Sequence, residues 1–289
     1  MPRSLTVQQP GPLQAFLFDS FPEVKKTRVK QWLKYDSVLV NGKVQSKHDH
    51  PLVAGDAVQV LTEAESRTQS SLPRDLKIVH EDDSIIVIDK PANLLSIATD
   101  AERKHTAYAR LTDYVRKGDP RSRERVWIVH RLDRETSGLM IFARTPQAKD
   151  VLQGGWDDVE KQYKAVTEGC PASAEGLLVS HLDENHPGKV FSAPASDKTR
   201  EAKTHYRVLK RGAKYTLIEL ALETGRRHQI RVQLADIRCP IVGDEKYGSR
   251  TDPAKRLGLH SCLLRFPHPV TKKEMCFESP LPSVLEKLI

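Results

Sequence analysis

Several features that mark large classes of protein are missing from this sequence of 289 residues. No apolar run approaches the roughly 18 residues that a membrane-spanning helix needs. The first residues lack the apolar core of a secretory signal. The four cysteines lie far apart and form neither the paired pattern of a zinc site nor a disulfide framework. These absences predict a cytoplasmic protein with reduced thiols, no bound metal and no membrane contact.

Glycine-rich loops of the kinds that hold phosphates or dinucleotides are also absent. We therefore expect chemistry that needs no nucleotide cofactor. The chain does have an excess of positive charge, with 46 Lys and Arg against 38 Asp and Glu and a formal net charge of +8. Such an excess indicates an anionic partner such as nucleic acid, although solubility alone also accounts for it.

A polar stretch, residues 63–74, separates a small head from a large body. It has no apolar period and carries a proline near its end, as linkers commonly do. Residues 1–62 are the predicted head, and residues 75–289 are the predicted body. Strand-like runs in the body are interspersed with helices without regular βαβ spacing, which favours an α+β fold around a mixed or antiparallel sheet.

The head is predicted to be a small α/β unit with a basic face. Leu13, Leu17 and Phe21 recur at helical spacing, and residues 25–35 predict a second helix. Asn41-Gly42 between apolar runs predicts a β-hairpin. The basic residues of the second helix are Lys25, Lys26, Arg28, Lys30 and Lys34. A solvated face is the common reason for such charges, but on a separate module they favour contact with RNA phosphates.

Three segments of the body carry residues that could do chemistry. Residues 129–144 place a charged loop before an apolar strand, where catalytic groups often lie, although a solvated corner is an equally good interpretation. Residues 226–237 predict a helix with Arg227 and Arg231 one turn apart, suited to an anion or to local acids. Tyr163, on a predicted strand, is by itself most simply a core aromatic with its hydroxyl at the rim.

Taken together, these segments resemble a known family. HRLDRETSGLMIFAR (residues 130–144) is similar to the signature of RluA-like RNA pseudouridine synthases. The likeness continues in family order through DKPANLLS (89–96), TGRRHQIR (224–231) and PIVGDEKYG (240–248). In the head, LKYDSVLVNGK and VAGDAVQVL resemble an S4-like RNA-binding domain. The resemblance implies a pseudouridine synthase-type mixed sheet with flanking helices.

The resemblance also implies roles for single residues. Asp133 corresponds to the catalytic aspartate, Tyr163 to the tyrosine that stacks on the base, and Arg231 to the arginine that pairs with the aspartate. Base flipping and substrate binding are expected of Arg131, His130 and Arg226. We therefore predict an Asp133–Arg231 ion pair that lowers the pKa of the carboxyl.

The implied activity is isomerisation of specific uridines in structured RNA, most favourably large-subunit ribosomal RNA, by a monomer without a cofactor. Three alternatives stay open: a tRNA substrate, hydrolysis of the glycosyl bond with Glu135 as a second carboxylate, and a non-catalytic role in ribosome assembly. The basic stretch of residues 103–125 either contacts RNA or is a solvated loop.

Overall fold

A computed structural model of the chain describes residues 3–34, 37–62, 76–100, 102–116, 119, 121–186 and 188–289. Its backbone contacts divide the chain into two compact units, residues 1–74 with 110–125 and residues 75–109 with 126–289. The predicted linker, residues 63–74, lies outside the described residues, and the boundaries at residues 62 and 75 stay predictions. Each unit is described by itself.

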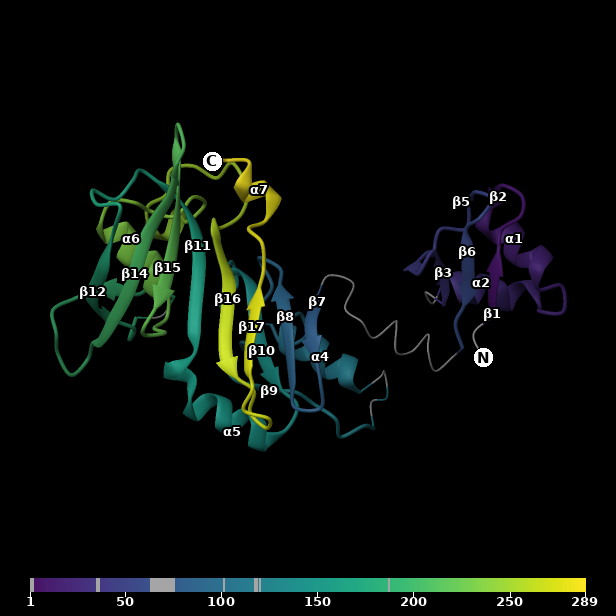
Figure 1. Ribbon diagram of the computed structural model, residues 1–289, viewed down its shortest axis with the longest axis horizontal. Coiled ribbons are helices and arrows are strands. Elements are labelled where there is room, and N and C mark those ends of the chain that lie inside the picture. The colour runs from purple at the N-terminus through teal and green to yellow at the C-terminus, as the bar shows by residue number, and fades with distance from the viewer. Residues whose placement is uncertain are drawn as a thin grey trace. The chain divides into compact units, whose positions relative to one another are not determined.

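The head consists of short strands and two helices (Figure 1). One sheet has the strand order β1-β6-β3-β4, and β2 pairs with β5. The elements are β1 (Arg3–Thr6), β2 (Gly11–Pro12), α1 (Leu13–Ser20), α2 (Lys26–Lys34), β3 (Val38–Val40), β4 (Lys43–Val44), β5 (Pro51–Leu52) and β6 (Ala57–Val60). The two predicted helices and the predicted hairpin are confirmed.

Apolar spacing and turn chemistry explain these elements. Leu13 and Leu17 on α1 share one buried core with Val29 on α2, so each helix turns one apolar face inward. Between β3 and β4, Asn41 and Gly42 have φ values of 50° and 76°. Two successive positive φ values are what a tight two-residue hairpin requires, and Asn and Gly are the residues that adopt them most readily.

The body is built on one large mixed sheet. Its strand order is β13-β12-β14-β15-β11-β16-β10-β8-β7, with β17 on β16 and β9 on β10. Among the strands that the structure describes, β10 and β16 pair in parallel and the others are antiparallel. Figure 1 shows these strands side by side. The predicted α+β fold with a mixed sheet is confirmed.

The strands of this sheet are β7 (Lys77–Glu81), β8 (Ile85–Lys90), β9 (Trp127–Ile128), β10 (Ser137–Ala143), β11 (Glu160–Glu168), β12 (Glu175–Asp183), β13 (Phe191–Ser192), β14 (Arg200–Arg211), β15 (Tyr215–Leu222), β16 (Leu259–Pro267) and β17 (Glu274–Glu278). The helices after residue 75 are α4 (Ala107–Val115), α5 (Pro146–Gly154), α6 (Gln229–Asp236) and α7 (Ser283–Glu286), with 3-10 turns η1 (Trp156–Asp158) and η2 (Glu245–Tyr247). No described helix is long and apolar enough to cross a membrane.

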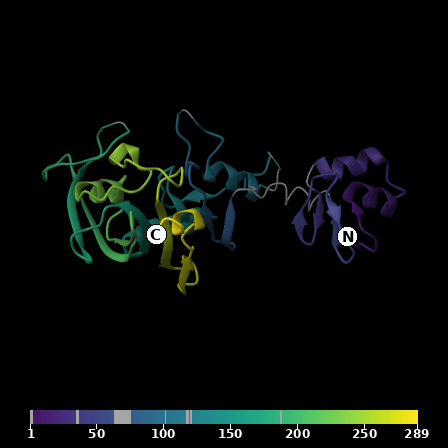
Figure 2. The same ribbon diagram turned by 90° about the horizontal axis from the view of Figure 1, so that it is seen from above.

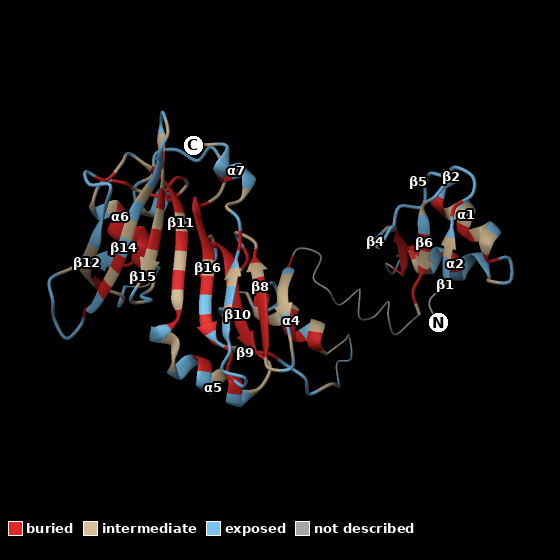
Figure 3. Cartoon of the chain, viewed as in Figure 1, coloured by how far each residue is buried: buried red, intermediate tan, exposed pale blue. Residues whose placement is uncertain are grey.

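Strand β10 lies at the centre of the core. All seven of its residues are buried, as the red strand in Figure 3 shows. Helix α5 packs Ala148 and Leu152 into the same cluster, and its start is capped because Thr145 Oγ accepts the Ala148 amide at 3.1 Å. Pro146 follows this cap at the start of the helix, where its missing N–H costs no hydrogen bond. A strand buried on both faces gives the polar loop before it a rigid support.

Helix α6 covers one face of the sheet at β12 and β14 (Figure 2). Val232 packs against Leu182 and Ala202. The side-chain amide of Gln233 donates to the Ala202 carbonyl at 3.0 Å, and its oxygen accepts the Thr204 hydroxyl at 2.6 Å. These buried contacts fix the helix, and with it Arg231.

Candidate active site

The loop of residues 129–136 leads from β9 into β10, and its backbone is held from the segment after β8. Ser96, only 3% exposed, donates its hydroxyl to the Leu132 carbonyl at 2.6 Å and accepts the Leu132 amide at 3.1 Å. The Thr136 amide donates to the Asp133 carbonyl at 3.2 Å. Asp133 therefore stands on a backbone that is hydrogen-bonded on both sides.

A fully buried lysine at the end of β8 is hydrogen-bonded to the same loop. Lys90 Nζ donates to the carbonyl oxygens of Pro91 at 3.0 Å, Leu94 at 2.7 Å and Arg134 at 3.2 Å. An ammonium group has three hydrogens to donate, so three carbonyls match its capacity. Burial lowers the pKa of Lys90 to about 7, against the opposing pull of nearby carboxylates. Lys90 ties the DKPANLLS segment to the loop that carries Asp133.

Arg231, near the start of α6, is the charged centre of the site and is only 3% exposed. Its Nε and Nη2 donate to the two carboxylate oxygens of Asp244 at 2.7 and 2.8 Å. Its Nη1 lies 3.5 Å from Asp133 Oδ2 and 3.4 Å from Glu135 Oε2. The predicted Asp133–Arg231 ion pair is confirmed, but the closer, two-pronged partner of the guanidinium is Asp244.

The pKa of Asp133 is raised, so the expectation of a lowered value is wrong. Burial of the carboxyl is the largest cause, the positive charge of Arg231 opposes it, and the negative charge of Glu135 adds to it. Because Asp244 already neutralises Arg231, the guanidinium stabilises the ionised form of Asp133 less than an unpaired arginine would. The result is a poorly solvated carboxylate, which is a stronger base than an exposed one.

Tyr163 reaches the same site from β11. A register shift between Gln162 and Tyr163 interrupts the pairing of β11 with β16, and such bulges turn a side chain away from the regular pleat. The side chain is 9% exposed, and burial raises the pKa of its hydroxyl further above the usual range. Tyr163 therefore keeps its proton at neutral pH.

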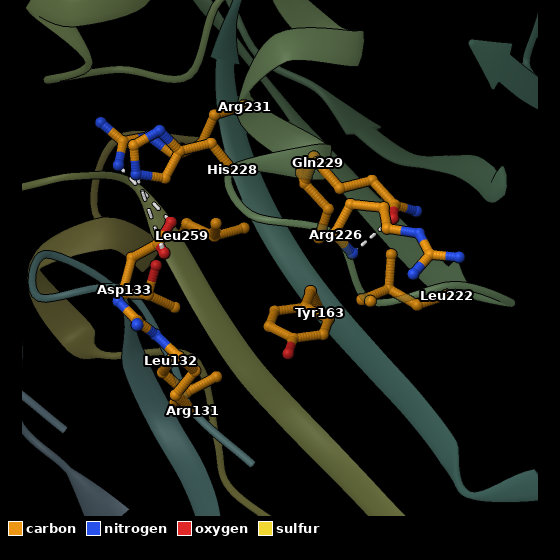
Figure 4. Close-up of a pocket in the computed structure, with 13 residues that line it drawn as sticks. Arg131, Leu132, Asp133, Tyr163, Leu222, Arg226, His228, Gln229, Arg231 and Leu259 are labelled. Atoms are coloured by element: carbon orange, nitrogen blue, oxygen red, sulfur yellow. Dashed lines mark hydrogen bonds and ion pairs between the residues drawn. The ribbon is translucent and has the colours of Figure 1, made fainter. Parts of the chain in front are cut away.

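Asp133, Tyr163 and Arg231 line one pocket. In Figure 4 the ring of Tyr163 stands between the loop that carries Asp133 and the segment that carries Arg226. The full lining is Arg131, Leu132, Asp133, Thr136, Tyr163, Leu222, Gly225, Arg226, His228, Gln229, Ile230, Arg231 and Leu259. The structure thus brings together three segments that are distant in sequence.

Two further predicted residues lie at this pocket with exposed side chains. Arg131 follows His130 on the loop, two residues before Asp133. Arg226 precedes α6, and its Nε donates to the Glu201 carbonyl at 3.1 Å. Both cations are therefore within the reach of an anionic ligand that enters the pocket.

His130 is placed differently. Its Nε2 accepts the Ile141 amide at 3.1 Å, and its ring stacks on Trp156 with 4.3 Å between the ring centroids. Burial lowers its pKa to about 3, so the ring stays neutral. It is not among the residues that line the pocket. These contacts hold His130 against β10, and its contact with substrate stays a prediction.

The predicted helix over residues 226–237 is wrong at its start, because α6 begins at Gln229. His228 adopts a left-handed φ of 54°, which a helix cannot contain. Arg227 therefore does not share a helical face with Arg231. Its Nη2 instead donates to backbone carbonyls, at 2.9 Å to both Glu184 and His186.

The basic residues predicted on the second helix of the head, namely Lys25, Lys26, Arg28, Lys30 and Lys34, are all exposed. Lys26 Nζ lies 5.5 Å from the ring centroid of Phe18. Within residues 103–125, Arg103, Lys104, Arg121 and Arg123 are exposed as well. Exposed cations of this kind are able to approach RNA phosphates.

Three residues of the site were not predicted from the sequence, namely Lys90, His228 and Asp244. Each lies inside a quoted motif, but nothing in the spacing marks its function. Asp244, in the PIVGDEKYG segment, is 1% exposed and looks like a turn residue in the sequence. The available signal was its charge inside an apolar segment, because a buried carboxylate needs a partner.

Comparison with known proteins identifies the family. A family model described as RNA pseudouridylate synthase matches residues 84–236. The ribosomal large subunit pseudouridine synthase D of Xanthomonas campestris pv. campestris is 36% identical, with 95% of this chain and 87% of that protein covered. The protein of the same name from Escherichia coli (strain K12) is 34% identical, with 96% and 89% covered. The chain belongs to the RNA pseudouridylate synthase family.

Solved structures agree with this family and its fold. Human RNA Pseudouridylate Synthase Domain Containing 4 has a TM-score of 0.62 at 25% identity, and the match covers 77% of this chain and 95% of that one. Human RNA Pseudouridylate Synthase Domain Containing 1 has a TM-score of 0.58 at 24% identity, over 73% and 86%, and shows the fold alone. The predicted pseudouridine synthase-type body and the predicted class of enzyme are confirmed.

Proposed function

We propose that this pseudouridine synthase isomerises one or more uridines of large-subunit ribosomal RNA, in the cytoplasm, with Asp133 as the catalytic carboxylate. The observation that carries the proposal is the pocket in which Asp133, Tyr163 and Arg231 meet, with Arg231 Nη1 at 3.5 Å from Asp133 Oδ2. The relatives named as ribosomal large subunit enzymes, which match this chain nearly end to end, support ribosomal RNA over tRNA.

The reaction breaks the bond between the anomeric carbon and N1 of uracil, and the base then turns and rejoins through C5. The C5 proton is released and N1 takes up a proton from water, so the product has the same atoms as uridine. Asp133 can attack a carbon of the nucleotide or remove a sugar proton. Both routes benefit from a carboxylate that is poorly solvated and held by Arg231, because its oxygen then needs little reorganisation.

Tyr163 and Arg131 take the roles of base contact and base flipping. The aromatic face of Tyr163 offers the uracil a stacking surface, and its protonated hydroxyl offers a donor. Extrusion of a uridine from structured RNA costs a few kcal/mol, which contacts to the flipped base offset. Arg131, exposed two residues before Asp133, is placed to occupy the space that the base leaves.

We also propose that the head, residues 1–62, is an S4-like RNA-binding domain. Exposed cations on α2 supply affinity by displacing counterions from phosphates, so binding weakens steeply as salt rises. Neither the head nor its charges take part in the chemical step.

Release of tritium from RNA labelled at C5 of uridine tests the function. Purified protein should release tritium from a large-subunit ribosomal RNA transcript and not from bulk tRNA transcripts. Release from tRNA alone would refute the ribosomal assignment, and free uracil in place of tritium would indicate hydrolysis of the glycosyl bond. RNA binding without either product would indicate a non-catalytic protein.

A further inference from the structure

His228 stands at the start of α6 and lines the pocket, although the roles given above do not use it. Its side chain is 12% exposed, and its Nε2 lies 3.9 Å from Asp133 Oδ1. Arg231 approaches the other oxygen, Oδ2. Figure 4 shows the imidazole next to the Arg231 guanidinium on the same side of Asp133. The two oxygens of the carboxylate therefore face two different groups.

The hydrogen bonds around the ring determine its tautomer. The Val190 amide lies 3.0 Å from the Tyr247 hydroxyl oxygen, and an amide can only donate. Tyr247 Oη, which accepts there, lies 2.7 Å from His228 Nδ1. Burial raises the pKa of Tyr247, so the hydroxyl keeps its proton and directs it to Nδ1. Nδ1 therefore accepts, and the hydrogen of the neutral ring is on Nε2, which faces Asp133.

The surroundings keep this ring uncharged. Burial is the largest cause that lowers the pKa of His228 to about 4; the positive charges of Arg231, Lys246 and Arg227 act in the same direction, and Glu135 opposes them. Asp133 also faces the ring. At neutral pH the group beside Oδ1 is therefore a neutral N–H donor and not a second cation.

We propose that His228 is a positioning residue: its Nε2–H, fixed by the Val190–Tyr247 relay, holds Oδ1 of Asp133 while Arg231 holds Oδ2. The separation of 3.9 Å is longer than a hydrogen bond, and catalytic hydrogen bonds of unliganded enzymes commonly shorten when substrate binds. With both oxygens held, the carboxylate keeps one orientation toward the nucleotide. This inference rests on the proposed role of Asp133.

Nuclear magnetic resonance of the full chain, labelled with 15N in the histidine rings, tests the relay without any activity assay. We expect the spectrum of the free enzyme at pH 7 to show a protonated Nε2 and an unprotonated Nδ1 for His228. Tyr247→Phe should remove this preference, whereas Tyr206→Phe on β14 should leave it intact. A ring protonated at Nδ1, or charged at pH 7, would overturn the proposal whatever the enzyme's activity.

Kinetics with a matched pair of variants tests the consequence. His228→Gln retains an N–H donor and His228→Leu does not, and both share the cost of a positive φ. We expect kcat of the Leu variant to fall by about tenfold relative to the Gln variant, with KM for RNA unchanged. The acid limb of its pH profile should also move to higher pH, because Asp133 loses a donor to its charged form.

Equal kcat values and equal pH profiles for the two variants would refute the role of His228 and leave the proposed function intact. A wild-type enzyme that releases no tritium would refute the proposed function itself, and the ring spectrum would still report on the relay.

Discussion

The pocket of the body and the basic face of the head hold their charges in opposite ways. In the pocket, Arg231 is 3% exposed and contacts three carboxylates, those of Asp244, Asp133 and Glu135. On α2, Lys26, Lys30 and Lys34 are exposed. A buried charge must be paired and hydrogen-bonded, so its geometry is fixed, whereas an exposed charge keeps its hydration and costs little.

This contrast indicates that the pocket serves the chemical step and that the head serves RNA binding. Fixed, desolvated charges suit a chemical step, because they need no rearrangement when the substrate's charge changes. Exposed, hydrated charges suit attraction to a phosphate backbone, whose exact path differs from site to site. Substitutions in the pocket should therefore alter folding and turnover, and substitutions on α2 should alter affinity alone.

The largest effect is expected from Asp244→Asn. Loss of one partner from a buried ion pair typically costs about 3–5 kcal/mol of unfolding free energy, because it leaves the other charge uncompensated. The freed guanidinium should then act more strongly on Asp133 and lower the pKa of that carboxyl. Urea denaturation measures the first effect, and the acid limb of the pH–rate profile measures the second.

Asp150→Asn on the surface of α5 is the control for this substitution. An Asp244→Asn variant as stable as the wild type would show that the ion pair is not needed for folding.

Lys90→Met should come next. Three carbonyl oxygens would lose their donor, and we expect a loss of about 2–3 kcal/mol in unfolding free energy. The pKa of Lys90 is about 7 in the folded chain and ordinarily 10.5, so the unfolded chain binds more protons between these values. The wild type should therefore gain stability as pH rises from about 7 to 10.5, and the Met variant should lack this gain. Lys149→Met serves as control, and parallel pH profiles for both variants would contradict the account.

A smaller effect is expected on the head. Lys26→Gln combined with Lys30→Gln should weaken RNA binding by about tenfold near physiological salt and reduce the salt slope by about two. The single-turnover rate at saturating RNA should not change. Filter binding across a salt series measures affinity, and the Arg versions of both substitutions keep the charge as a control. A slower chemical step in the Gln variant would break the division between head and pocket.

The smallest effect concerns the stability of the site itself. Because burial raises the pKa of Asp133, the folded chain resists its ionisation, and this penalty is present at neutral pH and vanishes as pH falls below the ordinary value for Asp. Asp133→Asn should therefore stabilise the protein by about 1 kcal/mol at pH 7. Thermal unfolding at pH 7 and at pH 3.5 measures the difference. A less stable variant at pH 7 would mean that the pairing with Arg231 outweighs burial.

Local patterns made much of the fold predictable. Asn41-Gly42 readily adopts the positive φ values that a tight hairpin requires, and Thr145-Pro146 is typical of a helix start such as that of α5. The charged loop before β10 could be found because an apolar run, Leu139–Ala143, follows it closely. The start of α6 could not be found, since His228 adopts its left-handed φ in contact with Tyr247, 19 residues later.

The partners of the charged groups were harder to predict. The motifs named Asp133 and Arg231, but the two-pronged bond from Arg231 to Asp244 depends on how α6 meets the segment before η2. Burial is the main reason that the pKa of Asp133 is raised, and a sequence does not display burial. Residues that hold a catalytic group through tertiary contacts leave no local pattern.

The central claim is that Asp133 performs the chemical step and contributes little to RNA binding. Single-turnover tritium release at saturating ribosomal RNA, measured beside RNA affinity for wild type and Asp133→Asn, tests it most directly. We predict a rate at least about four orders of magnitude lower with an unchanged Kd. An Asn variant that still turns over at a rate near that of the wild type, or that loses activity only because it no longer binds RNA, would contradict the account.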